Sequence, residues 1–108
     1  MAPSSGWLRE DLVEFSYEAD MGFTHRELER GLVTAVAPYT ISKTSSLKFE
    51  FRHDNYLVVL DLKPEETRKI ASIRLPITTI KLSFHGMPEE EYERFLHNFR
   101  RHLQRGGG

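Results

Sequence analysis

The sequence contains no cysteine, and this absence removes several kinds of chemistry together. Disulfide bonds, thiolate nucleophiles and cysteine-ligated zinc sites all require this residue. A cysteine-free chain is typical of a reducing compartment, so we expect a cytoplasmic protein.

Long hydrophobic runs are also missing. The longest one covers Tyr56–Leu60, far short of the roughly 20 residues that a membrane-spanning helix needs. Residues 1–6 have no basic start and no apolar stretch, so they do not resemble a secretory signal. The formal net charge is only −1, which gives no general attraction to nucleic acid or anionic lipid. We therefore expect a soluble protein.

The common motifs of enzymes and cofactor sites are absent as well. Neither glycine-rich phosphate-binding pattern occurs, and H-E-x-x-H and G-x-S-x-G are missing. His97 and His102 would lie about 140° apart around a helix, so they do not converge on one metal ion. His53 and Asp54 are neighbours in a predicted turn, where adjacent side chains seldom point together. We expect no enzymatic activity, no cofactor and no metal site.

The composition that is present is ordinary for a globular protein, with 39% hydrophobic, 11% aromatic and 29% charged residues. A chain of 108 residues can bury roughly 60–70% of its unfolded surface, which is enough for a core. No repeat or linker divides it. We predict one domain over residues 1–108, with a flexible lead-in at 1–6 and a flexible tail at 105–108.

The first predicted helix has a well-defined start. Thr24 and Glu27 form a capping box, in which each side chain accepts a hydrogen bond from a backbone N–H of the first turn. Pro38 ends the helix, which we place at about 24–37. Gly31 weakens a helix relative to alanine, and its presence indicates close packing at that turn.

The second predicted helix lies at about 88–104. Pro88 stands at its start, where a missing N–H has no cost. Acidic residues in its first turn and basic residues in its last turn match the helix dipole. One face of this helix carries the apolar residues Tyr92, Phe95, Leu96, Phe99 and Leu103.

Alternating apolar and polar residues predict the strands. They are expected at about 13–17, 47–52 and 56–62, with turns at 53–55 and 63–66. A further apolar alternation shifts by one residue part of the way along, because its members are Ala71, Ile73, Leu75, Ile77, Ile80, Leu82 and Phe84. Alternate residues of a strand face opposite sides, so this shift predicts a turn or bulge near 76–79. Two strands joined there are favoured over one bent strand.

The resulting order is β-α-β-β-β-β-α, an α+β fold with an antiparallel sheet of four to five strands and both helices on one face. This order resembles the TATA-binding-protein-like and helix-grip architectures, in topology alone. The resemblance covers most of the chain and carries no functional motif. The predicted core consists of Phe15, Phe49, Phe51, Leu60, Leu82, Phe84, Phe95 and Phe99.

The face of the sheet opposite to the helices is nearly neutral by the same alternation. The acidic residues predicted on this face are Glu14, Glu18, Glu50 and Asp61, and the basic ones are Lys48, Arg52, Arg74 and Lys81. Their charges nearly cancel. Phosphate contact requires a positive surface, so binding of DNA across this face is disfavoured. Leu57 and Val59 are the exception on it, forming a small apolar patch that we consider a candidate contact surface.

The last helix provides a second candidate surface. No acidic residue follows Glu93, and Arg94, Arg101 and Arg105 form a basic stripe opposite the apolar one. Our leading hypothesis is a small non-enzymatic protein-binding or assembly domain, possibly a homodimer, acting through Leu57 and Val59 or through these arginines. One alternative is a nucleic-acid-binding module that uses the arginines. Another is a small-molecule pocket between helices and sheet, lined by aromatic side chains.

Overall fold

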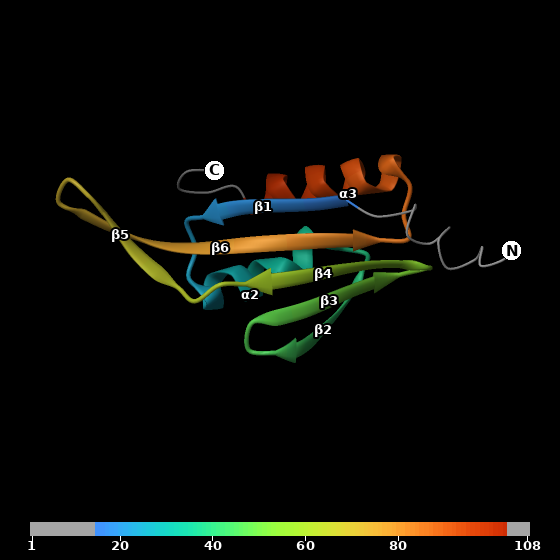
Figure 1. Ribbon diagram of the computed structural model, residues 1–108, viewed down its shortest axis with the longest axis horizontal. Coiled ribbons are helices and arrows are strands. Elements are labelled where there is room, and N and C mark those ends of the chain that lie inside the picture. Colours follow the sequence, from blue (N-terminus) through green and yellow to red (C-terminus); the bar gives the residue numbers. More distant parts are fainter. Residues whose placement is uncertain (1–14, 104–108) are drawn as a thin grey trace, which may run out of the picture.

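The computed structural model of the chain describes residues 15–103. Along the chain the elements are β1 (Phe15–Met21), α2 (His25–Ala35), β2 (Thr40–Ser45), β3 (Lys48–His53), β4 (Tyr56–Leu62), β5 (Glu66–Ile70), β6 (Ile73–His85) and α3 (Glu89–His102). The strands form an antiparallel sheet in the order β1-β6-β4-β3-β2, and β5 pairs with β6 outside this order (Figure 1). The predicted α+β architecture, with an antiparallel sheet and two helices, is confirmed.

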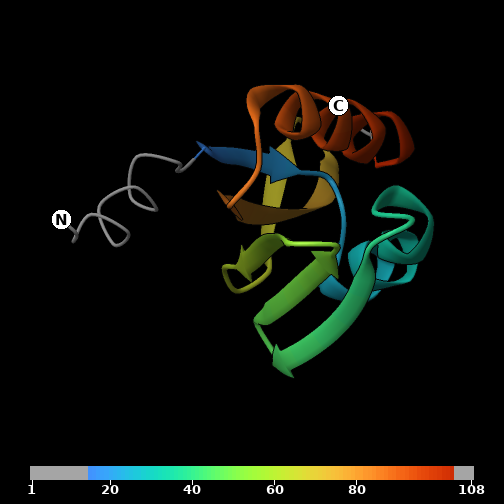
Figure 2. The ribbon, with the colours of Figure 1, turned by 90° about the vertical axis from the view of Figure 1, so that its right-hand side faces the viewer.

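Both helices lie on the same side of the sheet, and Figure 2 shows the sheet curving around them. Alternate residues of β3, β4 and β6 point towards the helices and are buried, for example Phe51, Leu60 and Leu82. From the other side α2 contributes Leu28 and Leu32, together with residues of α3. Every residue of the predicted core lies in or against this cluster, with Phe15 only half-buried at its border, stacked on Tyr92.

The start of α2 confirms the capping box. The backbone N–H of Glu27 donates to Thr24 Oγ1 at 3.1 Å, and the N–H of Thr24 donates to Glu27 Oε1 at 3.0 Å. The helix ends at Ala35, two residues earlier than predicted, with Val36 as its C-cap. A Cβ atom on Gly31 would lie 2.7 Å from Leu103 Cδ2, so this glycine does permit close packing of α2 against the end of α3.

Two predictions about the strands are wrong in detail. The strand β2 was not predicted, because its sequence TISKTS contains one apolar residue and shows no alternation. The turn placed near 76–79 lies instead between β5 and β6 at Ala71 and Ser72. Residues 76–79 lie within β6, which is thirteen residues long. Val13 and Glu14 of the first predicted strand lie outside the described residues.

Replacing Thr24 by alanine removes one half of the capping box. We expect the free energy of unfolding to fall by roughly 0.5–2 kcal/mol, because a backbone N–H of the first turn loses its partner. Urea unfolding followed by circular dichroism measures this change. Thr34→Ala, at an exposed position on the same helix, is the matched control and should cause no loss. An unchanged midpoint for Thr24→Ala would contradict the assigned cap.

Replacing Phe95 by alanine should cost about 3–5 kcal/mol of stability, since it leaves a cavity in the core. The Phe95 ring lies 5.1–6.2 Å from those of four other aromatic residues, measured between centroids: Tyr39, Phe51, Phe84 and Phe99. Phe95→Leu retains most of the apolar volume and should cost clearly less. Equal losses for the two variants, measured by denaturant unfolding, would contradict this packing.

Candidate interaction arm

The strand β6 extends beyond the rest of the sheet. Its pairing with β1 ends at Thr78 and its pairing with β4 ends at Ile80. Residues Ile73–Ile77 pair with β5 alone, so β5 and the first part of β6 form a two-stranded ribbon that projects from one end of the molecule (Figure 1). We call residues 66–77 the arm.

The register of the arm differs by one residue from that of the sheet beside it. Leu62 pairs with Ile80 and Glu66 pairs with Ile77, so three residues between β4 and β5 lie opposite two residues of β6. The extra residue is a bulge in the connection between β4 and β5. In contrast, β6 keeps one register against β1 over the whole of their pairing.

This continuity of β6 determines which way the apolar side chains of the arm point. In the sheet the even-numbered residues of β6 from Thr78 to Phe84 are buried against the helices. Ile73, Leu75 and Ile77 are odd-numbered and therefore belong to the opposite side of the sheet, which we call the outer face. Ile73 also pairs with Ile70 at the tip of the arm. Ile70, Ile73 and Leu75 are 54%, 58% and 37% exposed.

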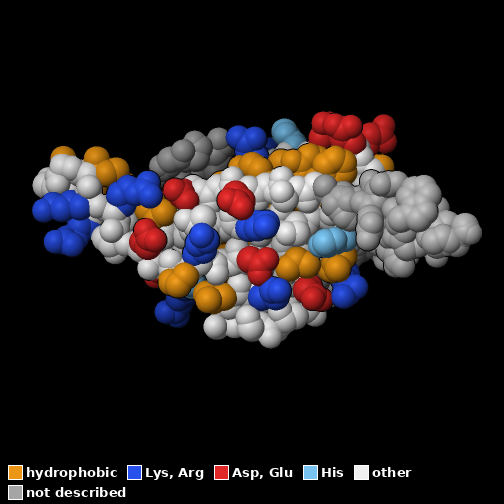
Figure 3. Space-filling view, in the orientation of Figure 1, with side chains coloured by type: hydrophobic (Ala, Val, Ile, Leu, Met, Phe, Trp, Pro, Cys, Tyr) orange, Lys and Arg blue, Asp and Glu red, His pale blue; other side chains and the backbone are white. Residues whose placement is uncertain are grey.

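The other side of the arm is basic. Lys69 and Arg74 are cross-strand partners on it, opposite to the isoleucine side. Arg68 follows on the outer face beside Leu75, and the sequence contains no acidic residue from 67 to 88. Figure 3 shows the basic side chains gathered on the arm at the left end of the molecule. The arm is thus an amphipathic hairpin.

The prediction that placed Arg74 on the outer face is wrong. In this part of β6 the odd-numbered residues, such as Ile73 and Leu75, belong to the outer face.

Polar contacts hold the base of the arm to β1 and to the segment between β1 and α2. Thr78 Oγ1 donates a buried hydrogen bond of 2.8 Å to the carbonyl of Phe23. The Asp20 carboxylate accepts hydrogen bonds from Thr79 Oγ1 at 2.7 Å and from Arg68 at 3.5 Å. The hydrogen bond from Thr79, aided by Arg68, holds the pKa of Asp20 below its ordinary value. A charged carboxylate therefore joins the first strand to both strands near the base of the arm.

The start of α2 holds the bulge on the other side. The backbone N–H of His25 donates to Glu65 Oε2 at 2.6 Å, and His25 Nε2 lies 2.8 Å from the carbonyl oxygen of Lys63. Lys63 in turn donates its N–H to the carbonyl of Thr79 at 3.0 Å. The direction in which the arm projects is therefore defined by contacts to β1, α2 and β6.

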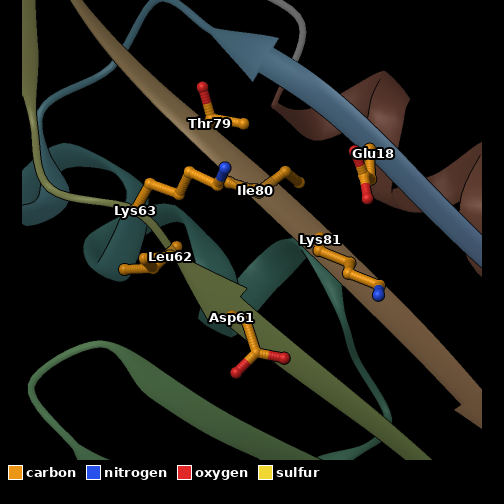
Figure 4. Close-up of a pocket in the computed structure, with 7 residues that line it drawn as sticks. All are labelled: Glu18, Asp61, Leu62, Lys63, Thr79, Ile80 and Lys81. Atoms are coloured by element: carbon orange, nitrogen blue, oxygen red, sulfur yellow. The ribbon is translucent and has the colours of Figure 1, made fainter.

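A shallow hollow of about 160 Å³ lies on the outer face next to the arm. Figure 4 shows the residues that line it at the end of β4, on the middle of β6 and on β1. They are Glu18, Asp61, Leu62, Lys63, Thr79, Ile80 and Lys81. Lys81 pairs across strands with Glu18 on one side and Asp61 on the other, so acidic and basic charges alternate around the hollow.

The residues proposed from sequence are not brought together. Leu57 and Val59 lie on the outer face of β4, half-buried between polar neighbours. Arg94 and Arg101 are exposed on α3, which covers the opposite side of the sheet. Arg105 lies outside the described residues. The arm was not recognised as a site, although the one-residue shift in the apolar alternation was the signal for it.

Arg94 is engaged in an ion pair within the fold. Its guanidinium donates to both carboxylate oxygens of Glu91, at 2.9 and 2.5 Å, and the hydroxyl of Tyr39 donates to the same carboxylate at 2.6 Å. The hydrogen bonds from Arg94, and then the one from Tyr39, hold the pKa of Glu91 below its ordinary value despite partial burial. Burial and the neighbouring carboxylate raise the pKa of Tyr39.

Among residues 15–103 no group of three or more histidine or acidic side chains is placed to hold a metal ion, and no helix there is long and apolar enough to cross a membrane. His53 Nε2 lies 3.7 Å from Asp54 Oδ2, so these neighbours do approach each other in their turn.

No protein-family model matches the chain, and no curated protein matches its sequence.

The Glu91 contacts predict a pH dependence of stability. Because the pKa of Glu91 is depressed in the folded chain, its contribution is present above the ordinary value of 4.5 and is lost as pH falls below it. Glu91→Gln should lower stability by about 1 kcal/mol near neutral pH and flatten its fall in acid. Unfolding free energies between pH 7 and pH 3 measure this, with Glu90→Gln on the exposed side of the helix as the control. Parallel pH profiles for the wild type and Glu91→Gln would contradict it.

Proposed function

We propose that this chain is a non-enzymatic protein-binding or assembly domain whose contact element is the arm. The observation that carries this proposal is the exposure of Ile70, Ile73 and Leu75 together on a hairpin that projects from the sheet. Large apolar side chains exposed side by side mark interaction surfaces far more often than single ones do. Val33, which is 68% exposed on α2, is such a single residue.

The chemistry of the arm favours a protein surface over nucleic acid. Phosphate groups are recognised by basic side chains, and the three basic residues of the arm suit that role. They do not explain why Ile70, Ile73 and Leu75 are exposed together on the outer face of the arm, where Arg68 is already paired with Asp20. Arg94, moreover, is already paired with Glu91. A small-molecule site between helices and sheet is disfavoured because Phe51, Phe84 and Phe99 occupy that space.

Site-specific photo-crosslinking in cells tests this proposal. A photoreactive amino acid is placed at Ile73 in one variant and at Val33 in the other, since both side chains are exposed, one on the arm and one on α2. We expect protein adducts from position 73 that are several-fold more abundant than those from position 33. Adding Leu75→Glu to the first variant should remove these adducts, because a buried charge is strongly unfavourable at an apolar contact.

The nature of the adducts separates the alternatives. Protein adducts of any mass at position 73 support the proposed function. Nuclease-sensitive adducts at that position would favour the nucleic-acid-binding alternative instead. Equal labelling at positions 73 and 33, or none at position 73, would refute the arm as the contact element.

A further inference from the structure

The tip of the arm carries different chemistry on its two sides. Ile70 and Ile73 pair on the outer face, and the next pair along the hairpin, Lys69 and Arg74, lies on the other side. All four side chains are exposed. Successive pairs of a ribbon point to opposite sides and lie about 3.4 Å apart along the strands. A molecule that contacts both sides of the tip therefore meets aliphatic groups on one side and two cations on the other.

The two cations are not neutralised within the described part of the chain. Like charges directly opposite each other on neighbouring strands repel and destabilise the pairing. Within residues 15–103, neither Lys69 nor Arg74 has an ion pair or a hydrogen bond with an acidic side chain. Glu66, the acidic residue nearest to them along the chain, lies on the outer face, where it pairs with Ile77. A carboxylate brought against both cations from outside would relieve their repulsion.

The aliphatic pair at the tip lacks cover as well. A hairpin of two strands is marginally stable in water unless a third strand, a helix or another hydrophobic surface packs on it. Ile70 and Ile73 are more than half exposed, and the contacts at the base of the arm reach only to Arg68, through Asp20. One flat surface cannot both cover the aliphatic pair and neutralise the cations, because the two pairs point in opposite directions. A cleft that encloses the tip can do both.

The composition of the arm favours a protein as the molecule that forms this cleft. Residues 66–77 contain no aromatic side chain, whereas single-stranded nucleic acids stack on such side chains and bilayer surfaces are met by tryptophan and tyrosine. The positive charge is also confined to a short segment. Glu65 and Glu66 stand at the base of the arm, and Glu66 is only about 10 Å from Lys69 along the strand. An extended polyanion faces these acids together with the cations, whereas carboxylates on one wall of a protein cleft face the cations alone.

We propose that the partner of the arm is a protein with a cleft that receives the tip. Its apolar wall packs on Ile70 and Ile73, and its other wall holds carboxylates against Lys69 and Arg74. This inference rests on the proposed function and adds the chemistry of the partner. The guanidinium of Arg74 can donate two hydrogen bonds to one carboxylate, and the ammonium of Lys69, directly across the ribbon, can donate to the same acidic group. Because the two walls differ, the tip enters the cleft in one orientation.

Reversing the two charges tests the acidic wall. A photoreactive amino acid at Ile73 reports on the contact in cells, and Lys69→Glu with Arg74→Glu is added to that chain. We expect the yield of protein adducts to fall at least about tenfold, since attraction to the carboxylates becomes repulsion. The reversed pair repels itself as the original pair does, so the internal repulsion of the hairpin is matched. Circular dichroism verifies that the variant is folded. An undiminished yield would overturn the inference.

Two control variants separate this effect from other consequences of the substitutions. Lys69→Arg with Arg74→Lys exchanges the two side chains and keeps both charges, so it should retain most of the adducts. Arg26→Glu with Arg30→Glu makes the same change of net charge at exposed positions on α2 and should leave the yield unchanged. An equal loss from the substitutions on α2 would show a general effect of charge and would overturn the inference.

Direct chemical coupling identifies the groups on the second wall of the cleft. The adduct formed at position 73 is purified and treated with a carbodiimide, which joins an amine to a carboxylate in contact with it. Peptide mass spectrometry should find an amide bond between Lys69 and an aspartate or glutamate of the captured protein. In the chain with Lys69→Arg and Arg74→Lys the bond should appear at position 74 instead. A captured protein that forms no such bond at either position contacts the outer face alone and would overturn the inference.

These results distinguish the chemistry of the partner from the function of the arm. Abundant protein adducts at position 73 that survive reversal of both charges would disprove the acidic wall and leave the arm as the contact element. Labelling at position 73 no stronger than at position 33 would disprove both proposals. Sedimentation of the purified full chain with phosphatidylserine vesicles, and not with phosphatidylcholine vesicles, would assign the arm to an anionic lipid surface and overturn the inference.

Discussion

The unbroken register of β6 determines where the apolar side chains in the second half of the chain can lie. Thr78, Ile80, Leu82 and Phe84 are all buried against the helices. Because β6 contains no bulge, every second residue on either side of this segment keeps the same orientation. The extra residue that the register requires lies in the connection from β4 to β5. The isoleucines of the arm consequently belong to the outer face.

The body of the fold could be predicted because its local signals agree with its tertiary packing. Thr24 and Glu27 define the start of α2 through short-range hydrogen bonds that need no other part of the chain. The stripe from Tyr92 to Leu103 buries the predicted face of α3. In β3 and β4 the alternation of apolar residues identifies the buried side directly. At each of these places the local sequence pattern and the tertiary packing favour the same structure.

The missed elements are those in which tertiary pairing overrides weak local signals. β2 is an edge strand with a mostly exposed, polar sequence, so its pairing with β3 leaves no hydrophobic pattern. The tip of the arm turns at Ala71, which adopts a left-handed conformation with φ of 57° without the glycine or asparagine that usually signals it. Pro76 indicates a turn, yet it lies within a strand. The candidate site was missed for the same reason, since the apolar shift was interpreted as a bend required to keep all residues in one core.

The position of Pro76 has a consequence for how this ribbon avoids open-ended aggregation. A projecting two-stranded ribbon with aliphatic side chains resembles the segments from which fibrils grow by addition of strands to a free edge. Pro76 is paired with Thr67 on one side, and it has no N–H to offer to a new strand on the other. Strand addition along the free edge of β6 is therefore interrupted in the middle of the arm. The faces of the ribbon are left as the surfaces open to contact, and a contact between faces ends at a defined complex, whereas strand addition continues as a fibre.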